Sequence, residues 1–255
     1  MTNRFDLSKK TALITGGSRG LGLSMAHAFA EAGANIVIVS RKQQACDDAA
    51  TAIAAEHGVK TWAFSRNVSA WDQCTDLAAE AEAATGGIDI LVNNAGLSPL
   101  YPSLTEIPEA LYDKVFGVNT KGPFRLSTLL GTKMAERGGG SIINISSIES
   151  LHPTPGALPY AAAKAGLNVL TQGLAQAFGP AVRVNTILAG PFLTDISQAW
   201  DMDAFNAIAR RSIVMQRGGE ADEIVGAALY FASDASTYTT AAALRVDGGV
   251  YGATT

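Results

Sequence analysis

Tyr160 and Lys164 are four positions apart in a segment whose composition favours a helix. In a helix, residues at this spacing lie on one face, about one turn from each other. A free phenol has a pKa near about 10 and is a poor base at neutral pH unless a nearby cation stabilises its ionised form. The spacing therefore predicts that Lys164 supports proton transfer by Tyr160, although the same pair of residues also occurs by chance.

Ser147 lies upstream of Tyr160, at the end of an apolar segment that predicts a strand. A hydroxyl at the carboxyl edge of a sheet can donate a hydrogen bond to a carbonyl oxygen on which negative charge develops. Ser146 is the alternative candidate, but successive side chains of a strand point to opposite faces. We therefore expect Ser147 to be the residue that faces Tyr160.

A glycine-rich turn follows the first apolar segment, Thr11 to Thr15, and leads directly into a helical segment. Glycines at such a junction let the backbone approach a pyrophosphate, and the helix N-terminus presents free N–H groups to it. Glycines also serve any tight turn, but the position after the first strand favours dinucleotide binding. The expected contacts are Gly16, Ser18, Arg19, Gly20, Leu21 and Gly22.

The end of the second predicted strand indicates which dinucleotide is bound. An acidic residue there grips the ribose 2′-hydroxyl of NAD, whereas this chain has Ser40 followed by Arg41. A hydroxyl and a guanidinium suit a 2′-phosphate, and Arg19 can approach the same group. We expect NADP(H); the alternative is that both arginines are ordinary solvated surface charges.

Two further segments follow predicted strands. Asn67 and Val68 come after the third strand, where Asn67 can donate to and accept from an adenine edge. The fourth strand ends in Asn93-Asn94-Ala95-Gly96, and ligands in such sheets lie beyond the carboxyl ends of the strands. Asn94, Ala95 and Gly96 are thus expected cofactor contacts, although Asn and Gly also favour simple turns.

Strand-like and helical segments alternate along the whole chain, which is typical of a parallel sheet covered by helices. We expect an α/β fold: a single Rossmann-type domain over residues 1–255, with a doubly wound sheet of about seven parallel strands and helices on both faces. The predicted strands are Thr11–Thr15, Ala34–Val39, Lys60–Phe64, Ile88–Val92, Ser141–Ile145, Val182–Ile187 and Leu244–Val246. The predicted helices are Leu21–Ala32, Gln43–Glu56, Ala70–Ala84, Pro108–Glu136, Pro159–Phe178 and Ala221–Ala232.

The segment around 191–218 has no clear strand or long-helix character. It predicts either a mobile lid over a substrate or a pair of surface helices that closes the core, and the two interpretations carry equal weight.

Composition excludes several functions. The 255 residues carry a net charge of -4 without a basic cluster, so neither nucleic acid nor an anionic membrane is an expected partner. No apolar run is long enough to span a membrane. The two cysteines, Cys46 and Cys74, have neither disulfide nor metal-ligand spacing, so we expect packing roles, no metal and a cytoplasmic location.

Over nearly its whole length the sequence resembles the short-chain dehydrogenase/reductase family, especially 3-oxoacyl-acyl-carrier-protein reductases. The resemblance rests on Thr15-Gly16 with Gly20 and Gly22, on Asn93 to Gly96, on Ser147 with Tyr160 and Lys164, and on Asp247-Gly248-Gly249. It implies that Asn119 is a fourth catalytic residue and that Thr194 contacts the nicotinamide. By the same resemblance the cofactor also touches Gly190, Phe192, Tyr160 and Lys164.

Three positions depart from the family pattern. Asn67 replaces a frequent aspartate, Ala189 replaces a proline, and the stretch Thr239 to Ala242 replaces a commoner Thr-Gly. None of these changes removes a catalytic group. The resemblance therefore still implies NADP(H)-dependent interconversion of a carbonyl and a secondary alcohol, with Tyr160 as acid and base, Ser147 polarising the carbonyl and Lys164 holding the ribose.

The substrate remains open. Expected pocket walls are apolar with a few polar points: Leu97, Ser98, Ile148, Glu149, Leu151, His152 and Phe192. We expect Glu149 to point to solvent and His152 to be exposed rather than catalytic. Ketones, 3-oxoacyl groups, sugars and steroid-like alcohols are comparable candidates, because no dense basic patch marks an acyl-carrier-protein partner.

Two other functions stay open, and so does the assembly. A NAD-linked dehydrogenase would make Arg41 incidental, and a non-catalytic NADPH sensor would not need Tyr160. The helical segments Pro108–Glu136 and Pro159–Phe178 are rich in Ala and Leu, and in relatives such helices pair. We expect a homotetramer, with a dimer as the alternative.

Overall fold

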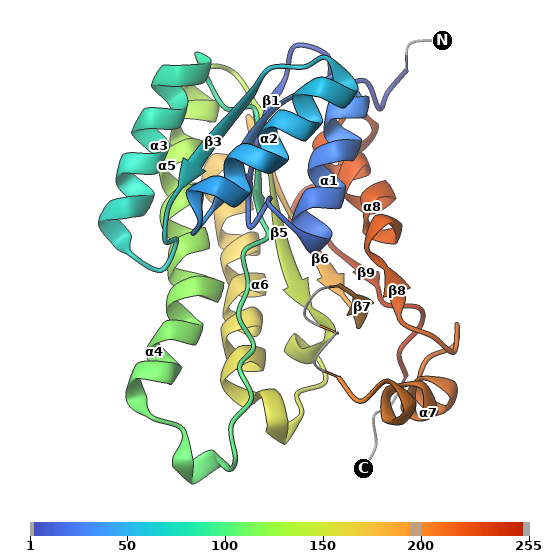
Figure 1. The fold of residues 1–255 in the computed structure, drawn as a ribbon. Helices are drawn as coiled ribbons and strands as arrows, with labels where there is room; N and C mark the ends of the chain where they lie inside the picture. Colours follow the sequence, from blue (N-terminus) through green and yellow to red (C-terminus); the bar gives the residue numbers. More distant parts are fainter. Residues whose placement is uncertain (1–2, 195–196, 198–199, 252–255) are drawn as a thin grey trace.

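Seven parallel strands form the central sheet of the computed structural model, which describes residues 3–194, 197 and 200–251 (Figure 1). The strand order is β3-β2-β1-β4-β5-β6-β9, so the winding direction reverses between β1 and β4. This confirms the predicted doubly wound sheet. The strands are β1 (Thr11–Thr15), β2 (Asn35–Ser40), β3 (Thr61–Ser65), β4 (Ile90–Asn93), β5 (Gly140–Ser147), β6 (Val182–Ala189) and β9 (Ala243–Val246).

The central strands are apolar because both faces of the sheet are covered. All five residues of β1 are buried, and its side chains alternate between two cores. Ile14 packs into one core with Phe29 and Phe231, and Leu13 packs into the other with Leu77. A strand buried on both sides has no polar face, which explains the apolar run Ala12-Leu13-Ile14 at its centre.

Three helices cover each face of the sheet (Figure 1). One layer holds α1 (Gly20–Glu31), α2 (Gln43–His57) and α8 (Val225–Ala232), and the other holds α3 (Trp71–Thr85), α5 (Gly122–Glu136) and α6 (Leu158–Phe178). None of the helices that the structure describes is both long and apolar enough to cross a membrane.

The predicted helix Pro108–Glu136 is interrupted. It consists of α4 (Glu109–Phe116), a π-helical turn (Gly117–Lys121) and α5. Gly122 follows the turn, and a Cβ there would lie 2.1 Å from the carbonyl oxygen of Val68. A π turn adds one residue to the helix and is frequent at functional sites. Here it carries Asn119 and brings the helix against the segment after β3.

The strands near the site run further than predicted. β5 ends at Ser147 and β6 ends at Ala189, because the two strands pair in parallel over their full length up to Ser147 opposite Ala189. The additional pairing places Ser147 at the carboxyl edge of the sheet, as the sequence predicts.

The segment around 191–218 has more regular structure than the sequence suggests. It contains β7 (Phe192–Leu193), which pairs with β8 (Gly219–Glu220), and α7 (Met202–Ser212). Residues 195–196 and 198–199 of this segment lie outside the described residues. In Figure 1, α7 lies beyond the carboxyl ends of the strands. A bridge between Ile213 and Val250 joins the end of α7 to the residues after β9.

Both cysteines are buried, as expected for packing residues. Burial raises the pKa of the Cys74 thiol to about 11, so this side chain stays a neutral thiol at neutral pH.

Ala241 lies in the loop before β9 with φ at 58°, a left-handed conformation that disfavours side chains. This is the stretch in which a commoner Thr-Gly is replaced. We predict that Ala241→Gly raises the free energy of unfolding by about 1 kcal/mol, because glycine adopts this conformation without strain. Urea unfolding of the two proteins measures the change. Ala243→Gly, at an ordinary strand position, is the matched control and should lower stability; an equal loss in both variants would contradict the strain at Ala241.

Candidate active site

The ammonium of Lys164 is buried. Its side chain comes from α6, only 3% of the residue is exposed, and Nζ donates to the carbonyl oxygen of Ile145 on β5 at 2.7 Å. Burial lowers the pKa of Lys164 to about 7, since the charged form loses its hydration. The lysine therefore changes charge near neutral pH.

Tyr160 lies one turn before Lys164 on α6, as the spacing predicts. Lys164 Nζ is 5.6 Å from the centre of the Tyr160 ring. Burial raises the pKa of Tyr160, a hydrogen bond with Ser147 lowers it, and the charge of Glu149 raises it. The net direction is upward, so the phenol keeps its proton at neutral pH.

The two neighbouring serines of β5 have different partners. Ser147 contacts Tyr160, and its Oγ accepts a hydrogen bond from the backbone N–H of Glu149 at 3.1 Å. Ser146 Oγ instead donates to the carbonyl oxygen of Lys164. The structure thus brings Ser147, and not Ser146, to Tyr160.

Asn119 is fully buried in the π turn and holds the segment after β4. Its Nδ2 donates to the carbonyl oxygens of Leu97 (2.8 Å) and Val115 (2.9 Å), and its Oδ1 accepts from the backbone N–H of Leu97. A Cβ on Gly96 would lie 3.4 Å from Asn119 Oδ1 and 3.7 Å from Lys164 Nζ. Gly96 therefore leaves room between the amide and the ammonium.

The glycine turn after β1 is as tight as the sequence predicts. Gly16 and Gly20 have φ of 66° and 53°, and a Cβ on Gly22 would lie 2.3 Å from the carbonyl oxygen of Gly16. Helix α1 begins at Gly20 with neither a capping side chain nor an acidic residue in its first turn. Its free N–H groups and positive dipole end fit a pyrophosphate. Ser18, Arg19 and Leu21 complete this turn.

Thr15 and Asn94 join the glycine turn to β4. Thr15 Oγ1 accepts from the backbone N–H groups of Asn94 (3.0 Å) and Ala95 (3.1 Å). Asn94 Nδ2 donates to the carbonyl oxygens of Thr15 and Gly16. The amide nitrogen of Asn94 is thus used within the protein, where it fixes the turn.

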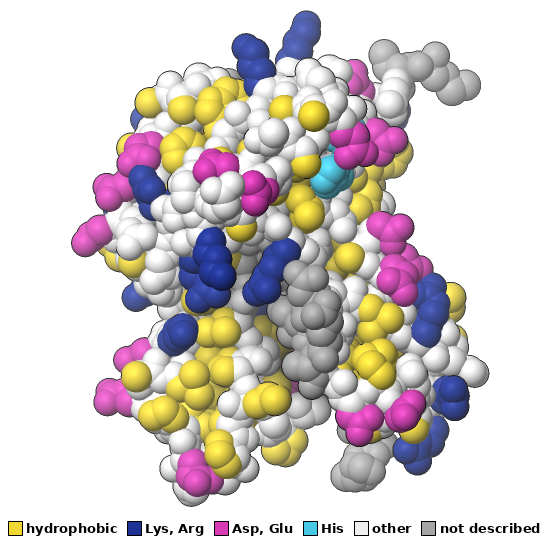
Figure 2. Space-filling model, viewed as in Figure 1, with side chains coloured by type: hydrophobic (Ala, Val, Ile, Leu, Met, Phe, Trp, Pro, Cys, Tyr) yellow, Lys and Arg dark blue, Asp and Glu magenta, His cyan; other side chains and the backbone are white. Residues whose placement is uncertain are grey.

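The basic residues at the end of β2 are accessible. Arg19 and Arg41 are exposed, and neither forms an ion pair with any residue that the structure describes. Ser40 is half-buried and hydrogen-bonds Cys46. Figure 2 shows lysine and arginine side chains gathered across the middle of the viewed face. A 2′-phosphate would thus find guanidinium groups that form no ion pair within the described part of the chain.

The residues after β3 are placed differently from each other. Asn67 is exposed, and its Oδ1 accepts from the backbone N–H and the hydroxyl of Ser69, which leaves its amide nitrogen for another partner. Val68 is buried in the core.

Of the residues after β6, two pack against other parts of the protein and one lies near the glycine turn that follows β1. A Cβ on Gly190 would lie 2.6 Å from Cα of Asp247, so this glycine serves the approach to the end of β9. Phe192 is buried in the core. Thr194 lies against the glycine turn, with its Cβ 3.6 Å from the position that a Cβ on Gly20 would take.

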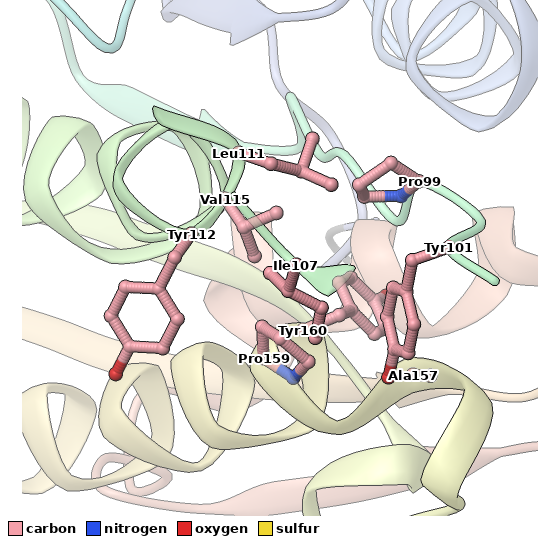
Figure 3. A pocket seen from close by; sticks show the side chains of 9 residues that line it. All are labelled: Pro99, Tyr101, Ile107, Leu111, Tyr112, Val115, Ala157, Pro159 and Tyr160. Carbon is pink, nitrogen blue, oxygen red and sulfur yellow. The ribbon is translucent and has the colours of Figure 1, made fainter. Parts of the chain in front are cut away.

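An apolar pocket lies beside Tyr160, and its lining was not predicted. Figure 3 shows Tyr101 and Ile107 next to the ring of Tyr160. The hydroxyl of Tyr101 accepts from the backbone N–H of Leu158 at 2.9 Å, which ties the loop after β4 to the start of α6. The lining residues are Pro99, Tyr101, Ile107, Leu111, Tyr112, Val115, Ala157, Pro159 and Tyr160, and the expected walls from Leu97 to Phe192 are not among them.

Glu149 does not point freely to solvent, so that expectation was wrong. Its carboxylate accepts from the backbone N–H of Thr154 at 2.9 Å and from the hydroxyl of the same residue. The contact closes the loop between Ser147 and Tyr160. His152, within this loop, is exposed as expected.

A buried network of hydrogen bonds, which the sequence did not predict, connects the sheet to α6. Asn93 Nδ2 donates to Asn144 Oδ1 (2.8 Å) and to Ser127 Oγ, and Asn144 Nδ2 donates to Thr171 Oγ1 (2.8 Å). Buried polar groups need such partners, and hydrogen bonds between elements fix their relative position. Asn93 Oδ1 has no partner among the described residues. This network of hydrogen bonds positions α6, and with it Tyr160 and Lys164, on β4 and β5.

Comparison with known proteins identifies the family. A family model described as "Enoyl-(Acyl carrier protein) reductase" matches residues 16–251. The human "Dehydrogenase/reductase SDR family member 4" is 34% identical over 251 residues, which cover 98% of this chain and 90% of that protein.

Solved structures agree. A 3-oxoacyl-(acyl-carrier-protein) reductase from Agrobacterium tumefaciens C58 with NADP bound has a TM-score of 0.91 at 32% identity, covering 96% of each chain. A 7α-hydroxysteroid dehydrogenase complexed with NADH has a TM-score of 0.92 at 30% identity, covering 98% of each chain. The chain belongs to the short-chain dehydrogenase/reductase family, and it is an oxidoreductase that acts on an alcohol or carbonyl group.

Lys164 should cost stability in the protein without cofactor. Because its folded pKa is about 7 against 10.5 for an ordinary lysine, the penalty is complete below pH 7 and disappears as the pH rises from 7 to 10.5. We predict that Lys164→Met raises the free energy of unfolding, with a gain about 2 to 3 kcal/mol larger at about pH 6 than at about pH 9. Urea unfolding at both pH values measures this. Lys114→Met removes an exposed lysine as the control, and a gain independent of pH would contradict the account.

Proposed function

We propose that the protein is an NADP(H)-dependent oxidoreductase that interconverts a carbonyl and a secondary alcohol by hydride transfer. The observation that carries the proposal is the contact between Tyr160 and Ser147, with the buried Lys164 one turn away, at the sheet edge that also bears the uncapped start of α1. These groups combine a proton donor, a hydrogen-bond donor for a carbonyl oxygen and a phosphate site in one cleft.

The four proposed catalytic residues have separate tasks. Tyr160 donates its phenolic proton to the carbonyl oxygen, and its raised pKa keeps that proton available at neutral pH. Ser147 orients and polarises the same oxygen. Lys164 holds the nicotinamide ribose and, when charged, supports the phenolate that remains. Asn119 positions the backbone beside Lys164.

A bound reduced nicotinamide supplies the hydride for the carbonyl carbon. We propose that it is held by the start of α1 and by the segments after β2, β3, β4 and β6. The proposed contacts are Gly16, Ser18, Arg19, Gly20, Leu21, Gly22, Ser40, Arg41, Asn67, Val68, Asn94, Ala95, Gly96, Tyr160, Lys164, Gly190, Phe192 and Thr194.

The preference for NADP(H) rests on this chain's own residues, since the similar structures hold NADP in one case and NADH in another. Arg41 and Arg19 are exposed and unpaired among the described residues, and the end of β2 carries no acid. A guanidinium without a carboxylate partner suits a 2′-phosphate.

We propose that the substrate is a ketone whose apolar body lies against the side chains beside Tyr160. The pocket beside Tyr160 is lined by Ile107, Leu111, Val115 and by aromatic and proline side chains, without a charged group. We propose that the segment around 191–218, with α7, covers this cleft. We further propose a homotetramer that uses the apolar groove of Phe116, Phe124 and Leu170 on α4, α5 and α6.

Turnover tests the proposed function. Purified protein is given NADPH or NADH with a panel of ketones, 3-oxoacyl thioesters and quinones, and loss of the reduced-nicotinamide absorbance is followed. We predict turnover of at least one ketone with NADPH and a loss of about 100-fold or more in Tyr160→Phe, because general acid catalysis contributes on this scale.

The exposed Tyr238→Phe is the matched control and should keep full activity. NADPH binding without turnover of any carbonyl would instead show a non-catalytic sensor. Turnover that survives in Tyr160→Phe would show that another group donates the proton.

Arg41→Ala tests the cofactor preference separately. We predict that it raises the KM for NADPH by about 10- to 100-fold, the equivalent of one charge-assisted phosphate contact, and leaves the KM for NADH unchanged. Initial rates with both cofactors measure the difference. Arg4→Ala, which removes an exposed arginine before β1, is the control. Equal effects on both cofactors, or a wild-type preference for NADH, would overturn the role of Arg41.

A further inference from the structure

Two of the three histidines of the chain meet on the surface formed by α1 and α2, outside the cleft described above. His27 lies on α1, and Glu56 and His57 are the last two residues of α2. His27 Nδ1 is 3.1 Å from His57 Nε2 and 3.2 Å from Glu56 Oε2, and the third separation, between Glu56 Oε2 and His57 Nε2, is 3.8 Å.

These separations match the ligands of a transition-metal ion. A point equidistant from the three atoms lies about 2.0 Å from each of them, which is the bond length of Zn²⁺ to imidazole nitrogen and carboxylate oxygen. Imidazole and carboxylate are the ligand types that zinc takes in proteins. We propose that His27, Glu56 and His57 form a Zn²⁺ site that links α1 to α2.

The burial of the three side chains suits such a site. The side chains of His57 and His27 are 13% and 31% exposed, so packing holds the two rings, whereas Glu56 is 61% exposed. The carboxylate can thus close on an ion that enters from solvent, and a fourth position stays open to water. Figure 2 shows histidine surface beside acidic side chains over the α1 and α2 region.

The position at the end of α2 also favours a cation. The last turn of a helix presents unpaired carbonyl groups and the negative end of the helix dipole. Helix α2 ends at His57, and Gly58 follows it in a left-handed conformation. The negative dipole end and the Glu56 carboxylate act in the same direction.

Without an ion, the close pair of ring nitrogens can be joined only by a proton. The rings meet edge to face, with centroids 5.3 Å apart, and one nitrogen must then carry the hydrogen that the other accepts. The alternative to a metal is therefore a hydrogen-bonded histidine pair, and the two occupants give different results with added Zn²⁺.

Isothermal titration calorimetry of the tag-free 255-residue protein with Zn²⁺, after treatment with a chelator, tests the site. We expect saturable binding of about one ion per chain and a rise in the thermal unfolding midpoint that the chelator reverses. His27→Ala should weaken the binding of Zn²⁺ at least about tenfold, since even the loss of a residue that hydrogen-bonds a metal ligand has an effect of this size.

Two further variants secure the result. Glu56→Gln changes a mostly exposed side chain and should also weaken binding, which keeps the test decisive if His27→Ala does not fold. His152→Ala removes the third histidine, which is exposed on another loop, and should bind like the wild type. The proposal is overturned if the wild type shows no saturable binding, if Glu56→Gln and His27→Ala retain it, or if His152→Ala loses it equally.

Discussion

The burial of the Lys164 ammonium is the constraint on which the rest of the cleft depends. A charge in the interior needs a hydrogen-bond partner and space, and the carbonyl oxygen of Ile145 provides the first. Gly96 provides the second, because a side chain there would approach both Asn119 and Lys164. The same burial lowers the pKa of the lysine to about 7, so the protein accepts a cost in stability beside the proposed proton donor.

The position of that ammonium is set by contacts between elements that are distant in the sequence. The buried hydrogen bonds from Asn93 to Asn144 and from Asn144 to Thr171 fix α6 on the sheet. Thr15 binds the segment after β4 to the turn after β1 through two hydrogen bonds. The proposed phosphate site and the proposed proton donor are thereby held at one edge of the sheet, where a hydride donor and a carbonyl could meet.

Features that depend on neighbouring residues could be predicted from the sequence. Contacts between residues that are far apart in the sequence could not. The alternation of strand-like and helical segments, the glycine turn and the four-residue spacing of Tyr160 and Lys164 are local signals. The parallel sheet and the proximity of Ser147 to Tyr160 could therefore be predicted. The π turn could not, since the residue that it adds depends on packing of Gly122 against Val68. No periodic pattern in the sequence marks the partners of Glu149 or the lining of the apolar pocket. The same holds for the contact of His27 with His57, which are 30 positions apart. Cofactor specificity, read from Arg41, stays a prediction because its partner is a ligand.

The central claim is that Tyr160, Ser147 and Lys164 bring a carbonyl to the 4-position of a reduced nicotinamide. The most direct measurement uses NADPH deuterated at that position on one face or the other, an apolar ketone that the enzyme consumes, and mass spectrometry of the alcohol. The account predicts that one labelled form delivers its deuterium to the carbinol carbon and the other does not. An alcohol without deuterium from either form would contradict direct hydride transfer in this cleft.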